Sequence, residues 1–444
     1  MVRIISLCAL AAFSLYPVHG INLDVTSVDS IKSAASSLAS QLVGYYPAHN
    51  STDFAVGLLP NPCSWWEAGS LFDTLIQYAH LTGDSQYNSI VSAGLQAQVG
   101  QNRDFAPLNE SATEGNDDQA TWALAAMSAA EAQLANGNAT QWLALADTVF
   151  NVLVQRWDNA TCSGGLRWQV YAFAIGFDYK NSASNGNFFQ LASRLARFTG
   201  NATYSNWANT VYAWTKQTGF IDSKWNVYDG APIVNDNCTE VNKVQYSYPA
   251  GSILSGVAHM YNITGSSTWQ AELNGLLNRT LSVFFVNGTA PATEVACEAT
   301  GCSLDQMAMK GLLGHWLADT MQMAPYTSAT IMPLFTRSAQ AAASVCDDTG
   351  CSEFWDGKHT GINGNATGDV GTSIDALSFV QGLLWQEAGL LGLPATVNGT
   401  ATIPVNATSS GATSTPTKKN AGASMRAETS LLISVLGFMM WVML

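Results

Sequence analysis

Three stretches of the chain follow one pattern: Thr82-Gly83-Asp84-Ser85-Gln86-Tyr87, Thr199-Gly200-Asn201-Ala202-Thr203-Tyr204 and Thr264-Gly265-Ser266-Ser267-Thr268-Trp269. Each begins with Thr-Gly, continues with polar residues and ends on an aromatic residue, and each separates two segments with helical periodicity. Glycine is the usual residue just beyond a helix end, and the polar residue after it can cap the following helix. The pattern therefore predicts three related helical hairpins.

Two further hairpins and a closing pair of helices extend this arrangement to the rest of the chain. No strand alternation of comparable length competes with it. The expected helices cover about residues 65–81 and 89–99, 118–131 and 142–157, 187–198 and 207–218, 246–262 and 271–284, 304–319 and 328–345, and finally 373–391, which would pair with 27–42. The sequence thus predicts an all-α protein with its helices in six hairpins.

The expected helices are of two kinds, and this difference indicates the fold. One half is rich in Ala, Gly, Ser and Leu with few charges, and its members begin near Trp65, Asp118, Asn187, Ser247, Leu304 and Ser373. Helices that are apolar on all sides are buried, whereas amphipathic ones face solvent. An inner ring of buried helices inside an outer ring of amphipathic ones is an (α/α)6 toroid. The alternative is an α-solenoid, but its ends would need polar caps that the sequence does not show.

Two adjacent carboxylates, Asp117 and Asp118, lie at the expected start of one buried helix. In a toroid the inner helices all begin at the same end, so these acids would face a single cleft. Cleavage of a glycosidic bond needs two carboxyl groups, one as nucleophile or base and the other as acid. A purely structural interpretation is also open, because Asn116 is a good N-cap, Gln119 suits a capping box and acids in a first turn complement the helix dipole.

The N-terminal end and a segment near the C-terminal end have compositions unlike a folded domain. Residues 1–20 have the basic start, apolar run and small-residue cleavage site of a signal peptide. Residues 394–420 are rich in Thr, Ser, Ala and Pro, which is typical of a flexible, O-glycosylated stalk. We therefore expect one catalytic domain, residues 21–393, in a secreted protein.

The last residues have the pattern of a GPI-attachment signal, covering 421–444. Asn420 is the expected attachment residue, with Gly422 and Ala423 as alternatives, and a spacer and an apolar tail follow. The tail is short for a membrane-spanning helix, which needs about 20 residues, although a tail-anchored helix is the competing interpretation. We expect the protein at the outer leaflet of the plasma membrane, facing the cell wall and held by a GPI lipid alone.

Charge and glycosylation signals fit that location. The formal net charge is −14, which argues against nucleic acid or anionic lipid as a partner. Asn-X-Ser/Thr sequons are dense, as in secretory proteins. They begin at Asn50, Asn109, Asn138, Asn159, Asn201, Asn237, Asn262, Asn278, Asn287, Asn365, Asn398 and Asn406.

The cysteines predict a small set of disulfides. Cys297-Glu-Ala-Thr-Gly-Cys302 and Cys346-Asp-Asp-Thr-Gly-Cys351 are twin loops, each expected to close on itself in an oxidising compartment. Zinc is the rival interpretation, but it favours C-x₂-C spacing and convergent histidines. Cys63, Cys162 and Cys238 can form at most one further bond, and the sequence leaves open which thiol stays free.

Beyond the Asp pair, several motifs resemble one enzyme family. The run Asn116–Glu131 resembles glycoside hydrolase family 76, the endo-1,6-α-mannosidases. Trp65-Trp66-Glu67-Ala68-Gly69, Gly164-Gly165-Leu166-Arg167-Trp168-Gln169 and Lys180-Asn181-Ser182-Ala183-Ser184-Asn185-Gly186 match as well, so the likeness covers about residues 30 to 390. Within the family, the chain is most similar to fungal GPI-anchored members needed for cell-wall biogenesis.

The resemblance implies the (α/α)6 fold and a retaining mechanism with Asp117 as nucleophile and Asp118 as general acid/base. Nothing in the sequence requires a cofactor or a metal. Core packing is the alternative role for the tryptophans, and a first-turn acid is the alternative for Glu67 and Asp305. The expected substrate-binding residues, near inner-helix starts or in matched loops, are Trp66, Glu67, Trp122, Trp168, Lys180, Asn181, Tyr246 and Asp305.

The implied substrates are α-1,6-linked mannosides. Relatives of this kind imply a transglycosylase that cuts the mannose core of GPI anchors and transfers GPI-anchored proteins to cell-wall glucan. Hydrolysis of α-1,6-mannan is the alternative, and a non-catalytic protein that binds wall glycans is the second. We expect a monomer.

Overall fold

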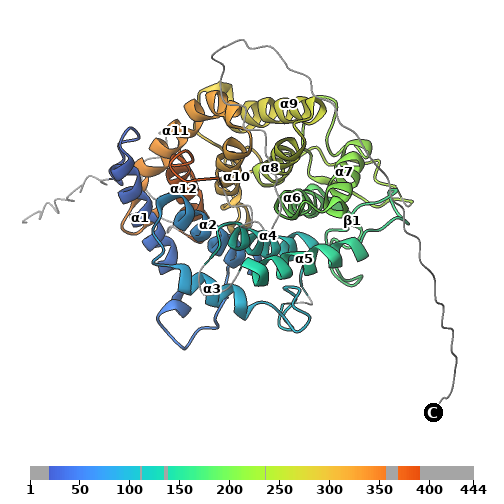
Figure 1. The fold of residues 1–444 in the computed structure, drawn as a ribbon, viewed down its shortest axis with the longest axis horizontal. Helices are drawn as coiled ribbons and strands as arrows, with labels where there is room; N and C mark the ends of the chain where they lie inside the picture. Colours follow the sequence, from blue (N-terminus) through green and yellow to red (C-terminus); the bar gives the residue numbers. More distant parts are fainter. Residues whose placement is uncertain (1–19, 111–112, 135–138, 236, 357–368, 391–444) are drawn as a thin grey trace, which may run out of the picture. The chain divides into compact units, whose positions relative to one another are not determined.

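The computed structural model describes residues 20–110, 113–134, 139–235, 237–356 and 369–390, whose α-helices form two concentric rings (Figure 1). The inner ring consists of α2 (Trp65–Thr82), α4 (Asn116–Glu131), α6 (Ser182–Thr199), α8 (Ser247–Thr264), α10 (Met309–Met323) and α12 (Val370–Gly382). The outer ring consists of α1 (Val28–Gly44), α3 (Asn88–Ala97), α5 (Ala139–Gln155), α7 (Ala202–Gln217), α9 (Ser267–Phe284) and α11 (Ser328–Ser344). The predicted (α/α)6 toroid is confirmed.

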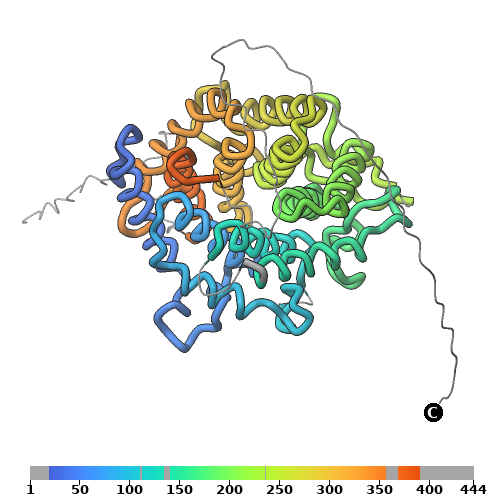
Figure 2. The backbone as a smooth tube through the Cα atoms, in the orientation of Figure 1, coloured from blue at the N-terminus to red at the C-terminus, as the bar shows by residue number. Residues whose placement is uncertain are grey.

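The inner ring is closed, which excludes a solenoid. Each inner helix packs against the next, and α12 packs against both α2 and α1. The first and last parts of the described chain therefore lie side by side, as the backbone tube shows (Figure 2). Closure leaves no open end of the repeat that a polar cap would have to cover.

The Thr-Gly turns end three inner helices as the sequence predicts. Gly83, Gly200 and Gly265 have positive φ angles of 78°, 70° and 58°. Each donates its backbone N–H to the carbonyl four residues earlier. Asn201 and Ser266 then cap α7 and α9 with their side-chain oxygens. A residue with a Cβ would be strained at these left-handed positions, so glycine allows each inner helix to turn directly into its outer partner.

Three inner helices have boundaries that differ from the prediction. α6 begins at Ser182 rather than near Asn187, because Asn181 accepts a hydrogen bond from the N–H of Ser184 and caps it. Leu304–Gln306 forms a separate 3₁₀ turn, so α10 begins only at Met309. α12 ends at Gly382, short of residue 391. These differences follow from capping and turn geometry, which helical periodicity does not report.

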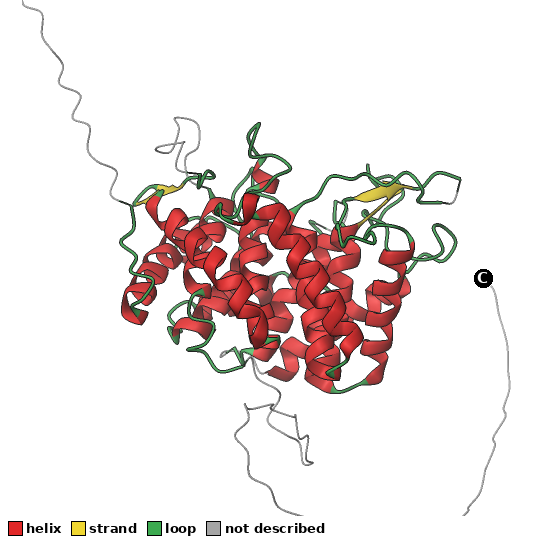
Figure 3. Ribbon diagram, turned by 90° about the horizontal axis from the view of Figure 1, so that it is seen from above, coloured by secondary structure: helices red, strands yellow, loops and turns green. Residues whose placement is uncertain are grey.

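Two short antiparallel sheets lie on the same face of the ring, at opposite sides of it, and were not predicted (Figure 3). β1 (Tyr179–Asn181) pairs with β2 (Gly230–Pro232), with Lys180 opposite Ala231. β3 (Cys346–Asp347) pairs with β4 (Gly350–Cys351). Their strands are only two or three residues long, too short to show an alternating pattern in the sequence.

The two predicted local disulfides, Cys297–Cys302 and Cys346–Cys351, are confirmed. The pairing that the sequence left open is Cys162–Cys238, and Cys63 is free among the cysteines of the described ranges. The predicted stalk, attachment residue Asn420 and GPI signal lie outside the described residues, as does the predicted signal peptide apart from Gly20. None of the helices in the described ranges is long and apolar enough to span a bilayer.

Candidate active site

An open cavity of about 620 Å³ lies where the inner helices begin. Its volume falls within the roughly 300–1,000 Å³ range of small-molecule sites. The N-terminal ends of α2, α4, α6 and α8 line it, together with the turn before α10. The predicted cleft is thus present. The start of the sixth inner helix, α12, was expected to contribute to it as well, but residues 369–375 do not line the cavity. Asp369 caps α12, and Asp375 is buried and accepts a hydrogen bond from the N–H of Gly311.

Asp117 lies in this cavity, in the first turn of α4, and two N–H groups hold its carboxylate. Oδ1 accepts a hydrogen bond from the backbone N–H of Asp118 (3.2 Å), and Oδ2 accepts one from Nδ2 of Asn181 (3.1 Å). Burial and the neighbouring charge of Asp118 raise the pKa of Asp117 well above its ordinary value, against the opposite effect of these hydrogen bonds. Asn181 therefore both caps α6 and positions this acid.

Asp118 is held from the other side. Its Oδ2 accepts a hydrogen bond from the backbone N–H of Gly115 (2.7 Å), the N-cap residue of α4, which has no side chain to return the bond. Burial, with a smaller contribution from the charge of Asp305, raises the pKa of Asp118 to about 6. Asp117 and Asp118 are half-buried, and two adjacent carboxyls repel each other when both are ionised, so the pair holds a proton to higher pH than ordinary aspartates. Asp118 can therefore cap the start of α4 and still present a carboxyl group for catalysis.

An aromatic wall stands beside the pair. Trp66 and Tyr248 line the cavity with their rings nearly parallel, 6.1 Å between centroids, and Trp316 continues the stack behind Tyr248 at 5.6 Å. The indole N–H of Trp66 donates to Oδ1 of Asp305 (2.7 Å), another cavity residue. Aromatic faces beside fixed carboxylates suit a sugar, whose C–H faces pack on rings while acids accept from its hydroxyls.

Of the eight predicted substrate-binding residues, the structure places five in the cavity: Trp66, Trp168, Asn181, Tyr246 and Asp305. The other three, Glu67, Trp122 and Lys180, do not line it.

The three residues outside the cavity make contacts that stabilise the fold. Glu67 is 1 % exposed and accepts a hydrogen bond from the backbone N–H of Ser64 as the capping acid of α2. Trp122 is completely buried, and its ring stacks between those of Trp65 and Phe105. Its position nearly two turns into α4 places the ring in the core and away from the cavity.

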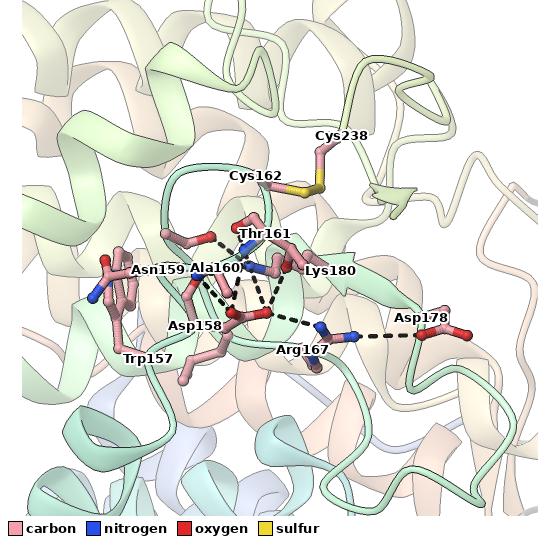
Figure 4. Close-up of polar contacts among 12 residues, drawn as sticks. Trp157, Asp158, Asn159, Ala160, Thr161, Cys162, Arg167, Asp178, Lys180 and Cys238 are labelled. Carbon is pink, nitrogen blue, oxygen red and sulfur yellow. Dashed lines mark hydrogen bonds and ion pairs between the residues drawn. A yellow bond between two sulfur atoms is a disulfide. The ribbon is translucent and has the colours of Figure 1, made fainter. Parts of the chain in front are cut away.

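Lys180 is also a structural residue, at the centre of a polar cluster beneath the cavity wall (Figure 4). Its ammonium group donates to the carbonyls of Asp158, Thr161 and Gly164 at 3.1, 2.8 and 2.6 Å. Burial lowers the pKa of Lys180 to about 8, although the charge of Asp158 acts in the opposite direction. The ammonium group binds the loop that carries Cys162, so Lys180 stabilises the fold of that loop.

Glu114 is a cavity residue that the sequence did not single out. It is 4 % exposed, and its Oε1 has no hydrogen-bond partner among the described residues. Burial raises the pKa of Glu114 to about 9, so it is uncharged at neutral pH. Its place just before the Asp pair in the sequence was the available signal.

Tyr179 and Asp229 are two more cavity residues missed in the sequence. The Tyr179 hydroxyl donates to Oδ2 of Asp229 (2.6 Å), and the two are brought together by β1 and the approach to β2. They are far apart in the chain, one in a short strand and the other just before one, so no local pattern marks them.

Comparison with known proteins decides the family. Residues 30–393 match the sequence model of Glycosyl hydrolase family 76. This chain belongs to that family. It is 41 % identical to mannan endo-1,6-alpha-mannosidase DCW1 of Candida glabrata over 355 residues, which are 79 % of this chain and 77 % of the relative.

Solved structures agree with the family assignment. The crystal structure of Dfg5 from Chaetomium thermophilum in complex with glucosamine is 36 % identical, with a TM-score of 0.79 over 84 % of this chain and 94 % of the other. An inactive variant of an alpha-1,6-mannanase from Salegentibacter, in complex with alpha-1,6-mannotriose, has a TM-score of 0.65 at 15 % identity over 80 % of this chain and 99 % of the other. At 15 % identity, the likeness to the Salegentibacter enzyme shows a shared fold alone.

This family 76 protein is a glycoside hydrolase, and the adjacent carboxyls of Asp117 and Asp118 line its cavity. Within the part of the chain that the structure describes, no group of three His, Cys, Asp or Glu side chains is arranged to hold a metal ion.

Proposed function

We propose that this family 76 enzyme cleaves α-1,6-linked mannosides with retention of configuration, with Asp117 as nucleophile and Asp118 as general acid/base. The observation that carries the proposal is the placement of two adjacent carboxyls with raised pKa values at one helix start, in an aromatic cavity. The name of the Candida glabrata relative supports the substrate class. In the Salegentibacter mannanase, the inactive variant replaces two consecutive aspartates by asparagine, which supports the role of the pair.

The reaction takes two steps. Asp118 donates its proton to the glycosidic oxygen while a carboxylate oxygen of Asp117 bonds to the anomeric carbon and the C–O bond to the leaving sugar breaks. Asp118, now ionised, accepts the proton of an incoming hydroxyl, whose oxygen bonds to the same carbon and releases Asp117. Two inversions restore the α configuration.

The hydrogen bonds at the pair suit these roles. Asp117 accepts from two N–H donors, which stabilise its ionised form and fix the attacking oxygen. Asp118 is bound through Oδ2 by Gly115, and no described residue donates a hydrogen bond to its Oδ1. The mechanism requires that the proton of the pair be on Asp118 once substrate is bound, even though the pKa of Asp117 is the more strongly raised in the free enzyme.

The acceptor distinguishes a transglycosylase from a hydrolase. We infer that the enzyme cuts the mannose core of GPI anchors and transfers the attached proteins to cell-wall glucan, at the outer face of the plasma membrane. The predicted signal peptide and GPI signal support this location, and the 36 % identity to Dfg5 supports the fungal group of the family. Hydrolysis of α-1,6-mannan is the second candidate, favoured by the names of the relatives.

The test uses an α-1,6-mannobiosyl donor with and without an oligosaccharide acceptor, with products followed by mass spectrometry. Wild type, Asp117→Asn and Asp118→Asn are compared, and we expect each variant to lose activity by a factor of at least about 10². Acceptor-dependent adducts from the wild type alone would support transfer. Free mannosides alone would indicate a hydrolase, and turnover that survives in either variant would refute the site.

Chemical rescue assigns the two roles within the pair. Azide should restore turnover of Asp117→Gly with a β-configured glycosyl azide, because the small anion would attack in place of the nucleophile. With Asp118→Gly and a donor whose leaving group needs no proton, azide should give the α-configured product. A β-configured azide from Asp118→Gly and an α-configured one from Asp117→Gly would make Asp118 the nucleophile and Asp117 the acid/base.

A further inference from the structure

The two most exposed large apolar side chains among the described residues lie on one loop. Ile175 is 95 % exposed and Phe173 is 76 % exposed, and Tyr171 beside them is 38 % exposed. Together they belong to residues 170–177, Val-Tyr-Ala-Phe-Ala-Ile-Gly-Phe, which we call the apolar loop. Several large apolar side chains exposed together mark an interaction surface more often than scattered single ones do.

The apolar loop is held in shape rather than left loose. The Tyr171 and Phe173 rings stack at 5.4 Å and 10° between planes, and the N–H of Ala174 donates to the carbonyl of Tyr171. At its base, Arg167 forms ion pairs with Asp158 (2.9 Å) and Asp178 (3.4 Å) (Figure 4). These contacts hold the loop in one conformation with its apolar side chains exposed to water, so a partner could bind it without first ordering it.

The loop is continuous with the wall of the active site. Trp168 and Gln169, which precede it, line the cavity, and so does Tyr179, which follows it. The backbone N–H of Trp168 donates to the carbonyl of Tyr179 (2.7 Å), so the two ends of the loop are tied together at the rim. Whatever covers the loop therefore lies next to a bound substrate.

The composition of the loop favours a lipid surface over a glycan. Apart from the Tyr171 hydroxyl, residues 170–177 have no polar side chain with which to bind sugar hydroxyls. Phenylalanine, isoleucine and tyrosine are residues that enter the boundary between headgroups and acyl chains. The net charge of −14 disfavours an anionic membrane surface and leaves a zwitterionic one.

We propose that the apolar loop inserts into the zwitterionic surface of a lipid bilayer and holds the cavity mouth against lipid-linked glycans. This inference rests on the proposed function for the nature of the substrate. The loop would act on substrate access, since it positions the cavity and does not touch the reacting atoms.

The first experiment reports insertion directly. The full chain carries Ile175→Cys labelled with a nitrobenzoxadiazole dye and is mixed with phosphatidylcholine vesicles. Ser37→Cys, exposed on α1, is the matched control, and labelled wild type gives the background from Cys63. We expect blue-shifted, brighter emission from position 175 alone. Equal spectra at both positions, or no change at position 175, would overturn the proposal.

The second experiment separates access from chemistry. Phe173→Ser/Ile175→Ser is compared with wild type on an α-1,6-mannoside linked to lipid in phosphatidylcholine vesicles and on soluble α-1,6-mannotriose. Burial of one such side chain corresponds to roughly a tenfold change in partition, so the rate on the lipid-linked donor should fall about tenfold or more, with the soluble rate unchanged.

Other outcomes contradict the inference in distinct ways. Equal losses on both donors would assign the loop to glycan binding. A change of oligomeric state in the double variant, measured by analytical ultracentrifugation, would assign it to a protein interface. If wild type turns over neither donor, the proposed function fails, while the fluorescence result still tests insertion.

Discussion

The position of Gly115 controls both carboxylates of the active site. Its N–H binds Oδ2 of Asp118, and its α-carbon lies so near the pair that a Cβ placed there would be 3.0 Å from Oδ2 of Asp118 and still closer to Oδ1 of Asp117. Its φ of −88° is open to any residue, so the need for glycine is one of space. The smallest side chain thus permits the two acids to share one helix turn.

We therefore predict that Gly115→Ala lowers kcat/KM by about 10²-fold or more, because displacement of catalytic groups by about 1 Å has effects of this size. The melting temperature should fall only slightly, since the backbone conformation suits alanine. Steady-state kinetics and thermal unfolding check this together. Gly44→Ala, where a Cβ meets no atom within 4 Å, is the control. Full activity of Gly115→Ala would show that the pair tolerates displacement.

Asn181 offers a test of pH dependence. Its amide donates to Asp117 and so lowers the pKa of that acid, while its oxygen caps α6 by accepting from the N–H of Ser184. In Asn181→Ser a capping oxygen remains but the amide donor is lost, so the pKa of Asp117 should rise. If Asp117 must be ionised to attack, the acid limb of the kcat/KM profile should move to higher pH. An unshifted limb would contradict the assignment of Asp117 as nucleophile.

At the scale of elements, the inner helices are joined by buried polar contacts as well as apolar ones. Arg194 on α6 donates to Oε2 of Glu131 on α4 (2.6 Å) and to the Ser128 hydroxyl (2.8 Å), and both charged side chains are buried. A buried pair is weak support for stability by itself, but loss of one partner leaves an uncompensated charge.

Arg194→Met should accordingly lower the free energy of unfolding by about 3–5 kcal/mol. The double variant Arg194→Met/Glu131→Leu should be more stable than Arg194→Met alone, because the buried carboxylate of Glu131 is then no longer left without its partner. Urea unfolding of wild type, both single variants and the double variant measures the interaction free energy between Arg194 and Glu131. A double variant that loses the sum of the two single losses would rule out a direct interaction.

At the scale of the whole molecule, buried carboxyls make stability depend on pH. Burial raises the pKa of Glu67 to about 8, of Glu294 to about 7 and of Glu114 to about 9, all above the ordinary 4.5. The folded state then binds more protons than the unfolded one. Stability from these groups is complete below about pH 4.5 and is lost as the pH rises through about 7 to 9.

Buried histidines act in the opposite direction. Burial lowers the pKa of His80, His259 and His315 below the ordinary 6.5, so the unfolded state takes up protons first and stability falls as the pH falls below about 6.5. We predict a maximum melting temperature near about pH 6, lower by several °C at pH 8. Calorimetry from pH 4.5 to 8 measures it, with Glu114→Gln expected to flatten the alkaline side. A melting temperature that rises steadily to pH 8 would contradict the raised pKa values of the buried carboxyls.

Prediction from sequence succeeded where the signal is local. The Thr-Gly turns at Gly83, Gly200 and Gly265 lie within single stretches of chain, and so does the helix start that places the acid pair in the first turn of α4. The expected cap of that helix was wrong, because Gly115 is its N-cap and Asn116 is its first helical residue. The Thr-Gly helix ends and the acid pair depend on residues a few positions apart, which is why the (α/α)6 fold and the centre of the candidate site could be predicted even though the bounds of α6, α10 and α12 were not.

Only the tertiary structure decided which of the remaining candidates face the cavity. Trp66 lines it, whereas Trp122 is buried in the core and Lys180 binds three carbonyls beneath the wall. Successive helix positions point about 100° apart, so the same residue type near two helix starts can face opposite ways. The Tyr179–Asp229 contact likewise required distant segments to meet. Sequence alone determined the ring and its acid pair, because capping and periodicity are local, while the lining depended on neighbours that folding supplies.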